Sequence, residues 1–396
     1  MRLPRQPRSR SLRIMRYALL LVILFTAACT RPEARVRVTF DAARITSISA
    51  SGLADRTTKR RVTADDPVRV ASVTKLVVAL GVMRMVDAGT LDLDRDVSDY
   101  LGWQLRNPAY PNKPISLRML LSHTAGVRDG NDYRVPLGKT VRAALADPKA
   151  WDAGHAPTTY FTYSNLNYPI IASVMETISG ERFDALMQRL VLKPLGVQAC
   201  FNWPTCSDAK IARAVVLYHA DGSVRNDDLK GKHPPCPVFT ESGCDLTSYR
   251  PGDNGALFSP QGGLRISARD LAKIGQMFLN DGKGFLSPAA VAALTTPVWT
   301  FDGRNGDTEG GFYCRYALAV QTLSTKQAGC RDDPYGDGVA RVGHAGEAYG
   351  LRSGLWIDRW SGKGVAFYAT AIPDEAPKGK RSAFTLVEEQ LATGRK

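Results

Sequence analysis

The 396-residue sequence has no apolar segment long enough to cross a membrane as a helix. Its prominent apolar run, Tyr17–Ala28, holds twelve residues, whereas a spanning helix needs about 20. No internal repeat is present, and the basic residues are scattered rather than gathered beside aromatic residues on one element. These absences argue against a polytopic membrane protein, a repeat protein and a nucleic-acid-binding protein.

The N-terminus has no acidic residue. Residues 1–29 hold six arginines, so they carry six of the fourteen net positive charges and leave +8 for the rest of the chain. A basic stretch followed by Tyr17–Ala28 is typical of a secretory signal. Leu24–Cys29 resembles a bacterial lipobox, with Thr26 where Leu is usual. We expect a signal peptide over 1–29, lipidation at Cys29 and a periplasmic, membrane-anchored lipoprotein; simple cleavage or an uncleaved anchor are the alternatives.

Six further cysteines form no paired C-x-x-C motif, which disfavours a zinc knuckle. An even number of cysteines in an exported chain indicates disulfides, and six cysteines allow 15 pairings. A metal site with His233 beside two of the cysteines is the rival interpretation. Pairing of sequence neighbours would close short loops, which predicts Cys200–Cys206, Cys236–Cys244 and Cys314–Cys330.

Apolar periodicity predicts strands near both ends of the chain and helices between them. This order indicates one sheet built from both termini, with a helical domain inserted and an irregular, cysteine-containing surface over 200–260. The expected strands are Val36–Thr39, Thr46–Ser51, Val68–Ala71, Tyr316–Thr322, Arg341–His344, Gly354–Ile357 and Val365–Ala371. The expected helices are Ser72–Ala88, Ser116–Ser122, Pro169–Ser179, Phe183–Leu192, Ser267–Leu279 and Ser382–Leu391.

Ser72 and Lys75 lie where a predicted strand meets a predicted buried helix. Residues i and i+3 share a helix face, so the Lys75 amine can reach the Ser72 hydroxyl. Free N–H groups in the first helical turn can stabilise an oxyanion. A nucleophile, a proton acceptor and an oxyanion site are what acyl transfer requires. A second S-x-x-K segment, Ser207–Lys210, lies in a polar loop and is interpreted as surface.

Two other segments offer polar groups for the same chemistry. Tyr163-Ser164-Asn165 could supply a tyrosine base if a cation such as Lys75 lowers the pKa of the phenol from about 10; an aromatic cluster is the structural alternative. His344-Ala345-Gly346 follows a predicted strand, and Gly346 would let a substrate lie along the strand edge. His344 could equally be a turn or core histidine.

Six segments in this order resemble the serine beta-lactamase-related family, which groups class C beta-lactamases, D-alanyl-D-alanine carboxypeptidases and carboxylesterases. The resemblance spans about Thr46–Ala371. The segments are Ala71–Lys75, Leu120–Gly126, Phe161–Asn165, Pro194–Gly196, Gly262–Leu264 with Ser267 and Asp270, and Gly343–Gly346.

The resemblance implies an α/β fold, an antiparallel sheet flanked by helices with a mainly helical second domain. We expect the sheet domain at 30–100 and 290–396, the helical domain at 101–289 and the active site between them. His123 is interpreted as structural support.

The resemblance also implies site roles. Ser72 would be the nucleophile, Lys75 and Tyr163 the acid/base pair, and Asn165 a ligand of the substrate amide or of Lys75. The backbone N–H groups of Ser72 and Glu347 would form the oxyanion hole.

His344 and Gly346 would line the substrate site. His344 stands where beta-lactamases usually have Lys. It should therefore attract carboxylated substrates more weakly than Lys does, and increasingly weakly as pH rises from about 6 to 8.

The expected function is an exported serine hydrolase, most like a carboxylesterase or D-alanyl peptidase, that forms an acyl-enzyme on Ser72. No metal or organic cofactor is expected. Substrates would be small esters, beta-lactams or peptidoglycan peptides. A beta-lactamase, a penicillin-binding sensor with little turnover, or an anchored interaction protein with a dead site are the alternatives.

Overall fold

An eight-stranded antiparallel sheet combines the two ends of the folded chain. The computed structural model describes Met1, residues 33–130 and residues 132–395, and the described residues from 33 onward form one compact unit. The strand order is β10-β11-β12-β13-β14-β15-β1-β2, which confirms the predicted sheet. The strands are β1 (Arg35–Asp41), β2 (Ile45–Ser51), β10 (Trp299–Thr300), β11 (Arg315–Tyr316), β12 (Gln321–Leu323), β13 (Arg341–Ala348), β14 (Leu351–Asp358) and β15 (Lys363–Ala369).

Both faces of the central strands are buried because helices cover the sheet on each side. Side chains alternate between the faces of a strand. In β14, Leu355 and Ile357 join the main core, to which α8 (Ala268–Leu279) contributes. Trp356 faces a second cluster with Phe384 and a residue of α10 (Leu386–Thr393). The two helices therefore pack on opposite faces, as the expected flanked sheet requires.

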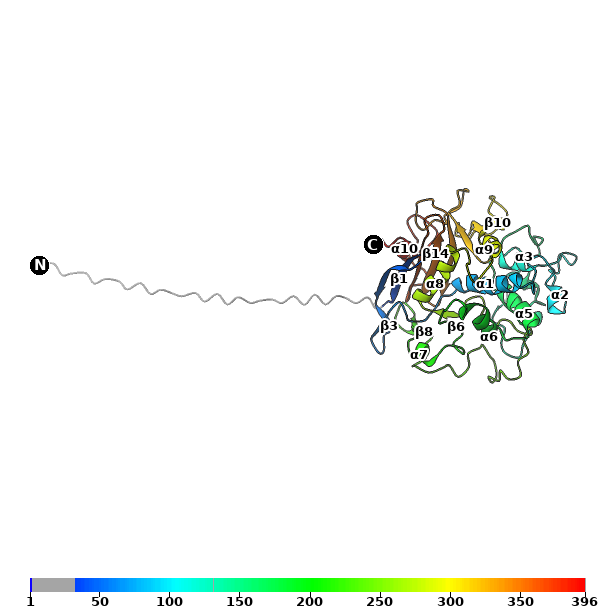
Figure 1. Ribbon diagram of the computed structural model, residues 1–396, viewed down its shortest axis with the longest axis horizontal. Helices are drawn as coiled ribbons and strands as arrows, with labels where there is room; N and C mark the ends of the chain where they lie inside the picture. The colour runs from blue at the N-terminus through cyan, green and yellow to red at the C-terminus, as the bar shows by residue number, and fades with distance from the viewer. Residues whose placement is uncertain (2–32, 131, 396) are drawn as a thin grey trace. The chain divides into compact units, whose positions relative to one another are not determined.

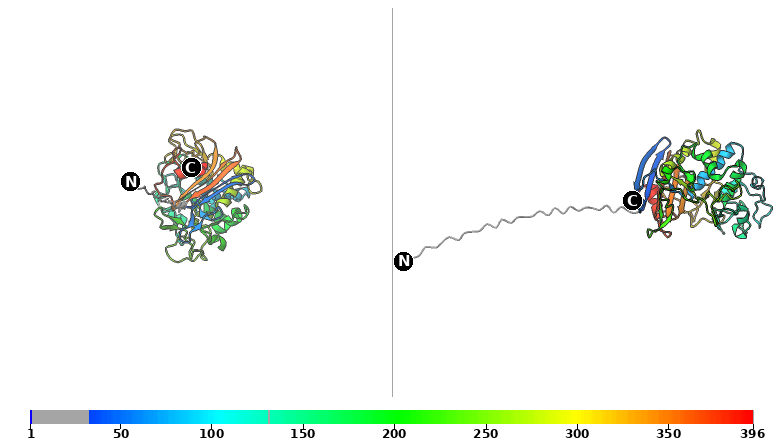
Figure 2. Two further views of the ribbon diagram at one scale, coloured as in Figure 1. Left: turned by 90° about the vertical axis from the view of Figure 1, so that its left-hand side faces the viewer. Right: turned by 90° about the horizontal axis from the view of Figure 1, so that it is seen from below.

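Helix α1 (Val73–Asp87) lies at the centre of the molecule and is buried along most of its length. Figure 1 shows it between the sheet side and the helices of the middle of the chain, and Figure 2 shows the strands gathered on one side. Its burial is why a polar Lys75 within it needs partners. The remaining helices are α2 (Ser98–Leu101), α3 (Leu117–Leu121), α4 (Val141–Ala144), α5 (Asn167–Ser179), α6 (Phe183–Met187), α7 (Asp208–Ile211) and α9 (Pro288–Thr295), with 3-10 and π turns at Pro148–Ala150 and Gln188–Leu192.

A short three-stranded sheet connects the start of α1 to distant parts of the chain. Its order is β5-β9-β6, and Arg69 on β5 pairs directly with Arg265 on β9. The sheet therefore places the segment before Ser72 beside the segment around Gly263. Its strands are β5 (Val68–Arg69), β9 (Leu264–Ile266) and β6 (Cys200–Phe201); two further ladders join β3 (Leu53–Asp55) to β4 (Arg60–Arg61) and β7 (Leu217–Tyr218) to β8 (Val224–Asn226).

Several predicted elements differ from the structure. The strand predicted over Val68–Ala71 is shortened to Val68–Arg69 and lies in the three-stranded sheet, and the helix predicted over Phe183–Leu192 is an α-helix followed by a π turn. The single strand expected over Tyr316–Thr322 is instead a tight hairpin, in which Ala319 has a φ of 59° and Ala317 N–H donates to the Val320 carbonyl. The last helix begins after Thr385 rather than at Ser382, because Thr385 and Glu388 form a capping box.

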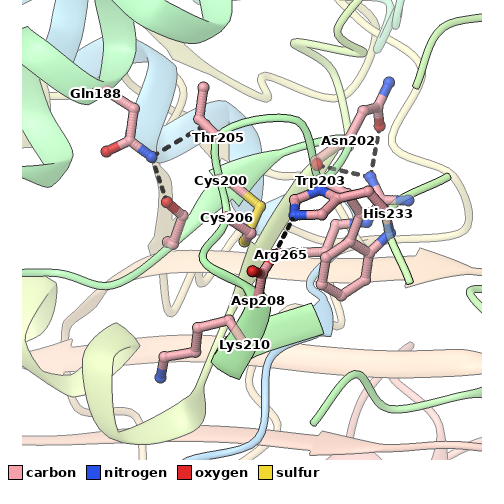
Figure 3. The surroundings of a disulfide bond; sticks show 12 residues. Gln188, Cys200, Asn202, Trp203, Thr205, Cys206, Asp208, Lys210, His233 and Arg265 are labelled. Carbon is pink, nitrogen blue, oxygen red and sulfur yellow. Dashed lines mark hydrogen bonds and ion pairs between the residues drawn. A yellow bond between two sulfur atoms is a disulfide. The ribbon is translucent and has the colours of Figure 1, made fainter. Parts of the chain in front are cut away.

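All three predicted disulfides are present, Cys200–Cys206, Cys236–Cys244 and Cys314–Cys330. Figure 3 shows the first beside Asn202 and Trp203. His233 lies against Asp208, with 3.0 Å between Nε2 and Oδ1, and within the described residues no group of three or more His, Cys, Asp or Glu side chains is placed to hold a metal ion. The predicted signal peptide and Cys29 lie outside the described residues, among which no helix is both long and apolar enough to span a bilayer.

Candidate active site

Ser72 and Lys75 meet at the first turn of α1, as their spacing predicts. The Lys75 Nζ lies 3.0 Å from Ser72 Oγ, 2.7 Å from Asn165 Oδ1 and 2.8 Å from the Gln261 carbonyl oxygen. These three acceptors match the three N–H groups of an ammonium. The Lys75 side chain is fully buried, and burial lowers its pKa to about 7. A fraction of the amine is therefore neutral near neutrality and can accept the Ser72 proton.

The backbone around Ser72 is held in an unusual conformation. Ala71 has a φ of 46°, a left-handed value that costs free energy in a residue other than glycine. The Ser72 N–H donates to no described residue. Strand β13 passes close by, because a Cβ placed on Gly346 would lie 3.2 Å from Ser72 N and 2.4 Å from the Val70 carbonyl oxygen. Only glycine fits there, and the backbone at Gly346–Glu347 therefore borders the serine.

The edge of β13 is open beyond its first residues. Strand β12 pairs with Arg341–Gly343, and the Gln321 side chain accepts a hydrogen bond from Ala345 N–H at 2.9 Å. From Gly346 onward β13 is paired with β14 on its other side and lines a cavity of about 620 Å³. Ser72, Tyr163, Asn165 and Glu347 line the same cavity. Backbone groups of an extended substrate can therefore reach this edge beside the serine.

Tyr163 stands over Lys75 but does not have the lowered pKa expected of a base. The Lys75 Nζ lies 4.9 Å from the centre of the tyrosine ring, which stacks on Tyr313. Burial raises the pKa of Tyr163 above its ordinary value. Its hydroxyl is buried and makes no hydrogen bond within the described residues. This corrects the expectation of a tyrosinate: the phenol is neutral, able to pass on a proton, and Lys75 is the better acceptor.

Two residues not expected to act in the site hold the Tyr163–Asn165 loop in place. The Asp129 carboxylate accepts hydrogen bonds from Ser164 Oγ, from the Asn165 backbone and side-chain N–H groups, and from Leu166 N–H, all between 2.8 and 2.9 Å. His123 accepts from Ser164 N–H at 3.1 Å through Nδ1, and its ring packs on Tyr163. The structural role predicted for His123 agrees with these contacts, whereas Asp129 was missed.

His344 lies beside the site rather than in its cavity. The side chain is fully buried and does not line the cavity, its Nε2 lies 2.7 Å from the Tyr316 hydroxyl, and its Nδ1 lies 2.5 Å from the Ala345 carbonyl oxygen. Burial and the nearby Lys75 lower the pKa of His344 to about 3. The imidazole is thus neutral throughout the range from about pH 6 to 8. This corrects the expectation of a pH-dependent contact between His344 and a substrate carboxylate.

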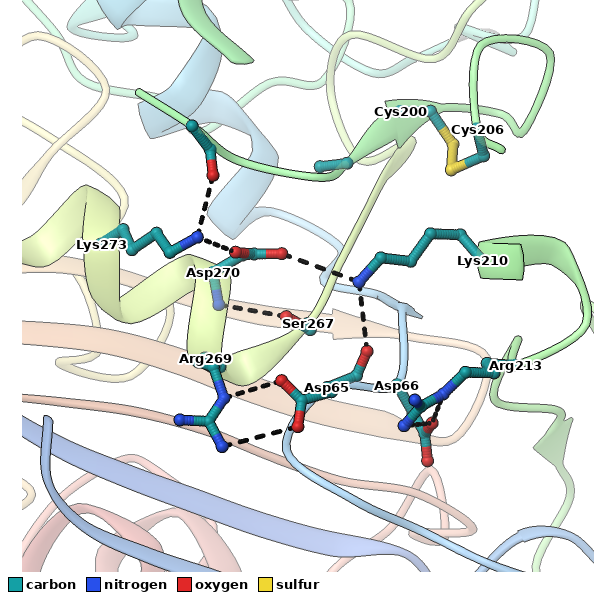
Figure 4. A network of polar contacts seen from close by, with 12 residues as sticks. Asp65, Asp66, Cys200, Cys206, Lys210, Arg213, Ser267, Arg269, Asp270 and Lys273 are labelled. Carbon is teal, nitrogen blue, oxygen red and sulfur yellow. Dashed lines mark hydrogen bonds and ion pairs between the residues drawn. A yellow bond between two sulfur atoms is a disulfide. The ribbon is translucent and has the colours of Figure 1, made fainter. Parts of the chain in front are cut away.

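The second S-x-x-K segment forms part of a surface network. Ser207 is exposed at the start of α7, and the Lys210 Nζ lies 3.9 Å from Asp270 Oδ2 and 3.4 Å from the Asp65 carbonyl oxygen. Figure 4 shows Lys210 extended toward Asp270 and Asp65. The exposed Ser207 agrees with the interpretation of the segment as surface, whereas the Lys210 side chain is only 13% exposed.

The sequence offered partial signals for the groups that were missed. Asp129 follows the Leu120–Gly126 segment by three residues, so its position was accessible even though its partners were not. Gln261 immediately precedes Gly262-Gly263-Leu264, but its carbonyl contacts Lys75 across 186 residues of chain. The residue types do not predict a backbone acceptor that lies so far away in the sequence.

A serine bonded to a buried lysine on a helix, under a tyrosine and beside an open strand edge, is the geometry of an active-site serine hydrolase. A family model described as Beta-lactamase matches residues 25–387, so the chain belongs to the beta-lactamase family of serine hydrolases. The predicted family, the predicted fold class and the predicted enzyme class are confirmed.

Individual relatives within this family differ in activity. The chain is 28% identical to "Penicillin-binding protein 4" of Amycolatopsis lactamdurans over 64% of each chain, and 31% identical to "Esterase EstB" of Burkholderia gladioli over 57% of this chain and 60% of the relative. The chain therefore spans less than two thirds of the length of these relatives. The structure of "EstCE1, a hydrolase with promiscuous acyltransferase activity" shares the fold, with a TM-score of 0.66 at 21% identity over 91% of this chain and 93% of that one.

Proposed function

We propose that this chain is an exported serine hydrolase of the carboxylesterase or D-alanyl peptidase type, with Ser72 as its nucleophile. The observation that carries the proposal is the 3.0 Å contact between Ser72 Oγ and the fully buried Lys75 Nζ, whose pKa is lowered to about 7. A surface lysine would be protonated at neutral pH and could not accept the serine proton. Burial removes that obstacle without any cofactor.

The proposed acylation begins when Ser72 Oγ attacks the substrate carbonyl carbon and its proton passes to the Lys75 amine. The carbonyl oxygen becomes an oxyanion, which the N–H groups of Ser72 and Glu347 stabilise. As the tetrahedral intermediate collapses, the bond to the leaving group breaks and the leaving group takes a proton. The neutral Tyr163 phenol donates that proton and recovers one from the Lys75 ammonium. Water then repeats the sequence on the acyl-enzyme and releases the acid.

Asn165 and Gly346 complete the proposed site. Asn165 holds the Lys75 Nζ at 2.7 Å through Oδ1, while Asp129 accepts from its Nδ2 at 2.8 Å. This orientation supports Asn165 as the group that fixes the lysine. Gly346 keeps the β13 edge close enough for an extended substrate. His344 does not line the cavity; it contacts the Tyr316 hydroxyl and so supports the site indirectly.

Export is proposed from the N-terminal sequence and the disulfides. Three disulfides are the pattern of a protein that folds in an oxidising compartment. We propose lipidation at Cys29 and a periplasmic location. Metabolic labelling with a fatty-acid probe tests this: the full chain should be labelled and the Cys29→Ser variant should not. Equal labelling of the two proteins would overturn the anchor.

Intact-mass spectrometry tests the nucleophile and the substrate class together. The protein should gain one fluorophosphonate adduct, which peptide mapping places on Ser72, and Ser72→Ala should gain none. An adduct at another residue would overturn the mechanism. A penicillin adduct that persists for hours would favour a penicillin-binding sensor, and its rapid loss with ring-opened product would favour a beta-lactamase. A transient adduct with esters alone supports the esterase.

A further inference from the structure

A second cavity adjoins the one that contains Ser72. It has a volume of about 410 Å³, and neither Ser72 nor any residue of β13 lines it. One residue that lines both cavities, Gln261, accepts a hydrogen bond from Lys75 through its backbone carbonyl. The two cavities therefore meet beside Lys75. The residues that line both cavities are Arg69, Arg134, Ser259, Gln261 and Tyr349. Two of these side chains are cationic and none is acidic.

Arg69 is a nearly buried guanidinium with unused donors at this junction. Its Nη1 donates to the Gly262 carbonyl oxygen at 2.8 Å, and its guanidinium lies 5.0 Å from the centre of the Tyr349 ring. Its Nε is buried without a hydrogen bond, and its Nη2 donates to no described residue. A buried guanidinium normally uses most of its five donors. The remaining Arg69 donors can bind an acceptor supplied by a ligand.

The positive charge of Arg69 is only partly balanced. Arg265 is its direct partner across β5 and β9, so two like charges stand opposite one another. A single buried carboxylate, Asp227, serves both: it lies 2.9 Å from Arg265 Nη2 but 4.0 Å from Arg69 Nε. Figure 3 shows Arg265 beside Asn202 and Trp203, which line the same cavity. Burial and the charge of Arg265 lower the pKa of Arg69 to about 10, the direction that an excess of positive charge produces.

The exposed carboxylates Asp132 and Asp228 do not cancel this excess, and the carboxylates Asp129, Glu309, Glu347 and Glu388 line the first cavity but not the second. Arg134 pairs with Asp132 at 2.6 Å, but both side chains are about half exposed, so that pair is weak. Asp228 also lines the second cavity and is exposed to solvent. Among the described residues that line the second cavity, the buried charged groups are therefore the guanidiniums of Arg69 and Arg265 and the carboxylate of Asp227. Arg134 is exposed to solvent at the junction.

We propose that the junction of the two cavities is a subsite for a carboxylate of the substrate, bound by Arg69 and Arg134. The assignment rests on the proposed function, because it specifies the substrate class of the same site. A substrate whose reacting carbonyl lies at Ser72 would extend past Gln261 and place its anionic end between the two guanidiniums. Carboxylate–guanidinium hydrogen bonds would then use the free Arg69 donors.

Two matched ester pairs test the subsite with the complete protein. Nitrophenyl hydrogen glutarate against nitrophenyl pentanoate places the carboxylate on the acyl side, and acetoxybenzoate against phenyl acetate places it on the leaving side. In at least one pair, Arg134→Gln should lower the acidic-to-neutral ratio of kcat/KM by about tenfold, the effect of one lost charged hydrogen bond. Arg142→Gln, an exposed arginine outside both cavities, should leave the ratio unchanged.

Binding of glutarate to the Ser72→Ala variant, measured by calorimetry, provides a readout that needs no turnover. It should weaken about tenfold when Arg134→Gln is added and weaken with rising salt. If the esters are hydrolysed but neither ratio responds, the subsite is wrong and the proposed function stands. If neither ester is hydrolysed while glutarate binding depends on Arg134, the proposed function is wrong and the subsite stands. If the affinity for glutarate does not change in Arg134→Gln, the subsite is also wrong.

Discussion

The chain contains two Ser-x-x-Lys segments, Ser72–Lys75 at the start of α1 and Ser207–Lys210 at the start of α7. In the first, the lysine is fully buried and turns back to its own serine, at 3.0 Å. In the second, the serine is exposed and the lysine extends to Asp270 and to the Asp65 carbonyl. Both segments begin a helix, so spacing alone does not separate them.

The difference lies in what surrounds each lysine. Among the described residues, Lys75 has no carboxylate in direct contact and donates to three neutral acceptors, and burial lowers its pKa to about 7. Lys210 instead has the Asp270 carboxylate 3.9 Å from its Nζ. Around Lys75 the loss of water outweighs the charges of Asp129 and Glu309, which act in the opposite direction on its pKa.

The largest effect is expected when the two serines are exchanged for alanine. Ser72→Ala should reduce hydrolysis of a short nitrophenyl ester by about 10⁴-fold or more, because no acyl-enzyme can form. Ser207→Ala, the matched control, should retain activity within about twofold, since surface substitutions rarely matter. Initial rates with both purified variants measure this, and circular dichroism checks the fold. Substantial activity in Ser72→Ala would remove the distinction between the segments.

The two lysines should differ almost as strongly. Lys75→Ala should reduce kcat/KM by at least ~10²-fold, as expected when general-base help is lost. Tyr163→Phe should cost a similar factor, because proton transfer to the leaving group is lost. Lys210→Ala should change kcat/KM by less than about twofold, because Lys210 does not line the cavity that contains Ser72. A large loss in Lys210→Ala with an intact fold would show that the α7 segment also acts in catalysis.

The pH profile should report the burial of Lys75. Below about pH 7 the amine is protonated and cannot accept the serine proton, so kcat/KM for a neutral ester should rise about tenfold per pH unit and level off above that pH. His344, whose pKa is about 3, and Tyr163, whose pKa is raised, do not titrate in this range. The same ascending limb should therefore remain in Tyr163→Phe. A flat profile from about pH 6 to 8 would contradict the role of Lys75 as the base.

The smallest effect concerns the Asp129 carboxylate, which holds the Tyr163–Asn165 loop beside Lys75. Asp129→Asn keeps one acceptor oxygen of two, so the Tyr163–Asn165 loop should loosen and kcat should fall by about tenfold. Asp129 also raises the pKa of Lys75, so its neutralisation should move the pH limb to lower pH. Asp147→Asn, another exposed aspartate that caps a short helix, should leave the limb in place. If the ascending limb of the pH profile does not move in Asp129→Asn, Asp129 has only a structural role.

Much of the site could be predicted because its members lie in short segments with local signals. The i, i+3 spacing brings Ser72 and Lys75 together on any helix, and the match to a known family located Tyr163 and Asn165. The three disulfides were predictable because each closes a short loop. Residues such as Asp129 and the Gln261 carbonyl were missed because their contacts join segments far apart in the chain.

His344 and Tyr163 show where residue type misleads. A histidine in solution titrates near neutrality, and a tyrosine beside a cation is expected to ionise more readily. In the folded protein, burial outweighs both expectations, and it lowers the pKa of His344 and raises that of Tyr163. The sign of each shift depends on desolvation, which is a property of packing and not of neighbours along the chain.

The amino-acid sequence was sufficient to establish the family, the sheet built from both termini, the disulfide pairs and the serine–lysine pair, since each depends on local spacing or on hydrophobic pattern. Only the tertiary structure decided which lysine is buried against its own serine, where the His344 ring points and how Arg69 comes to face Arg265. Those outcomes depend on burial and on charges brought together from distant segments. Electrostatic energies depend steeply on distance and on exclusion of water, and both are set when the chain packs.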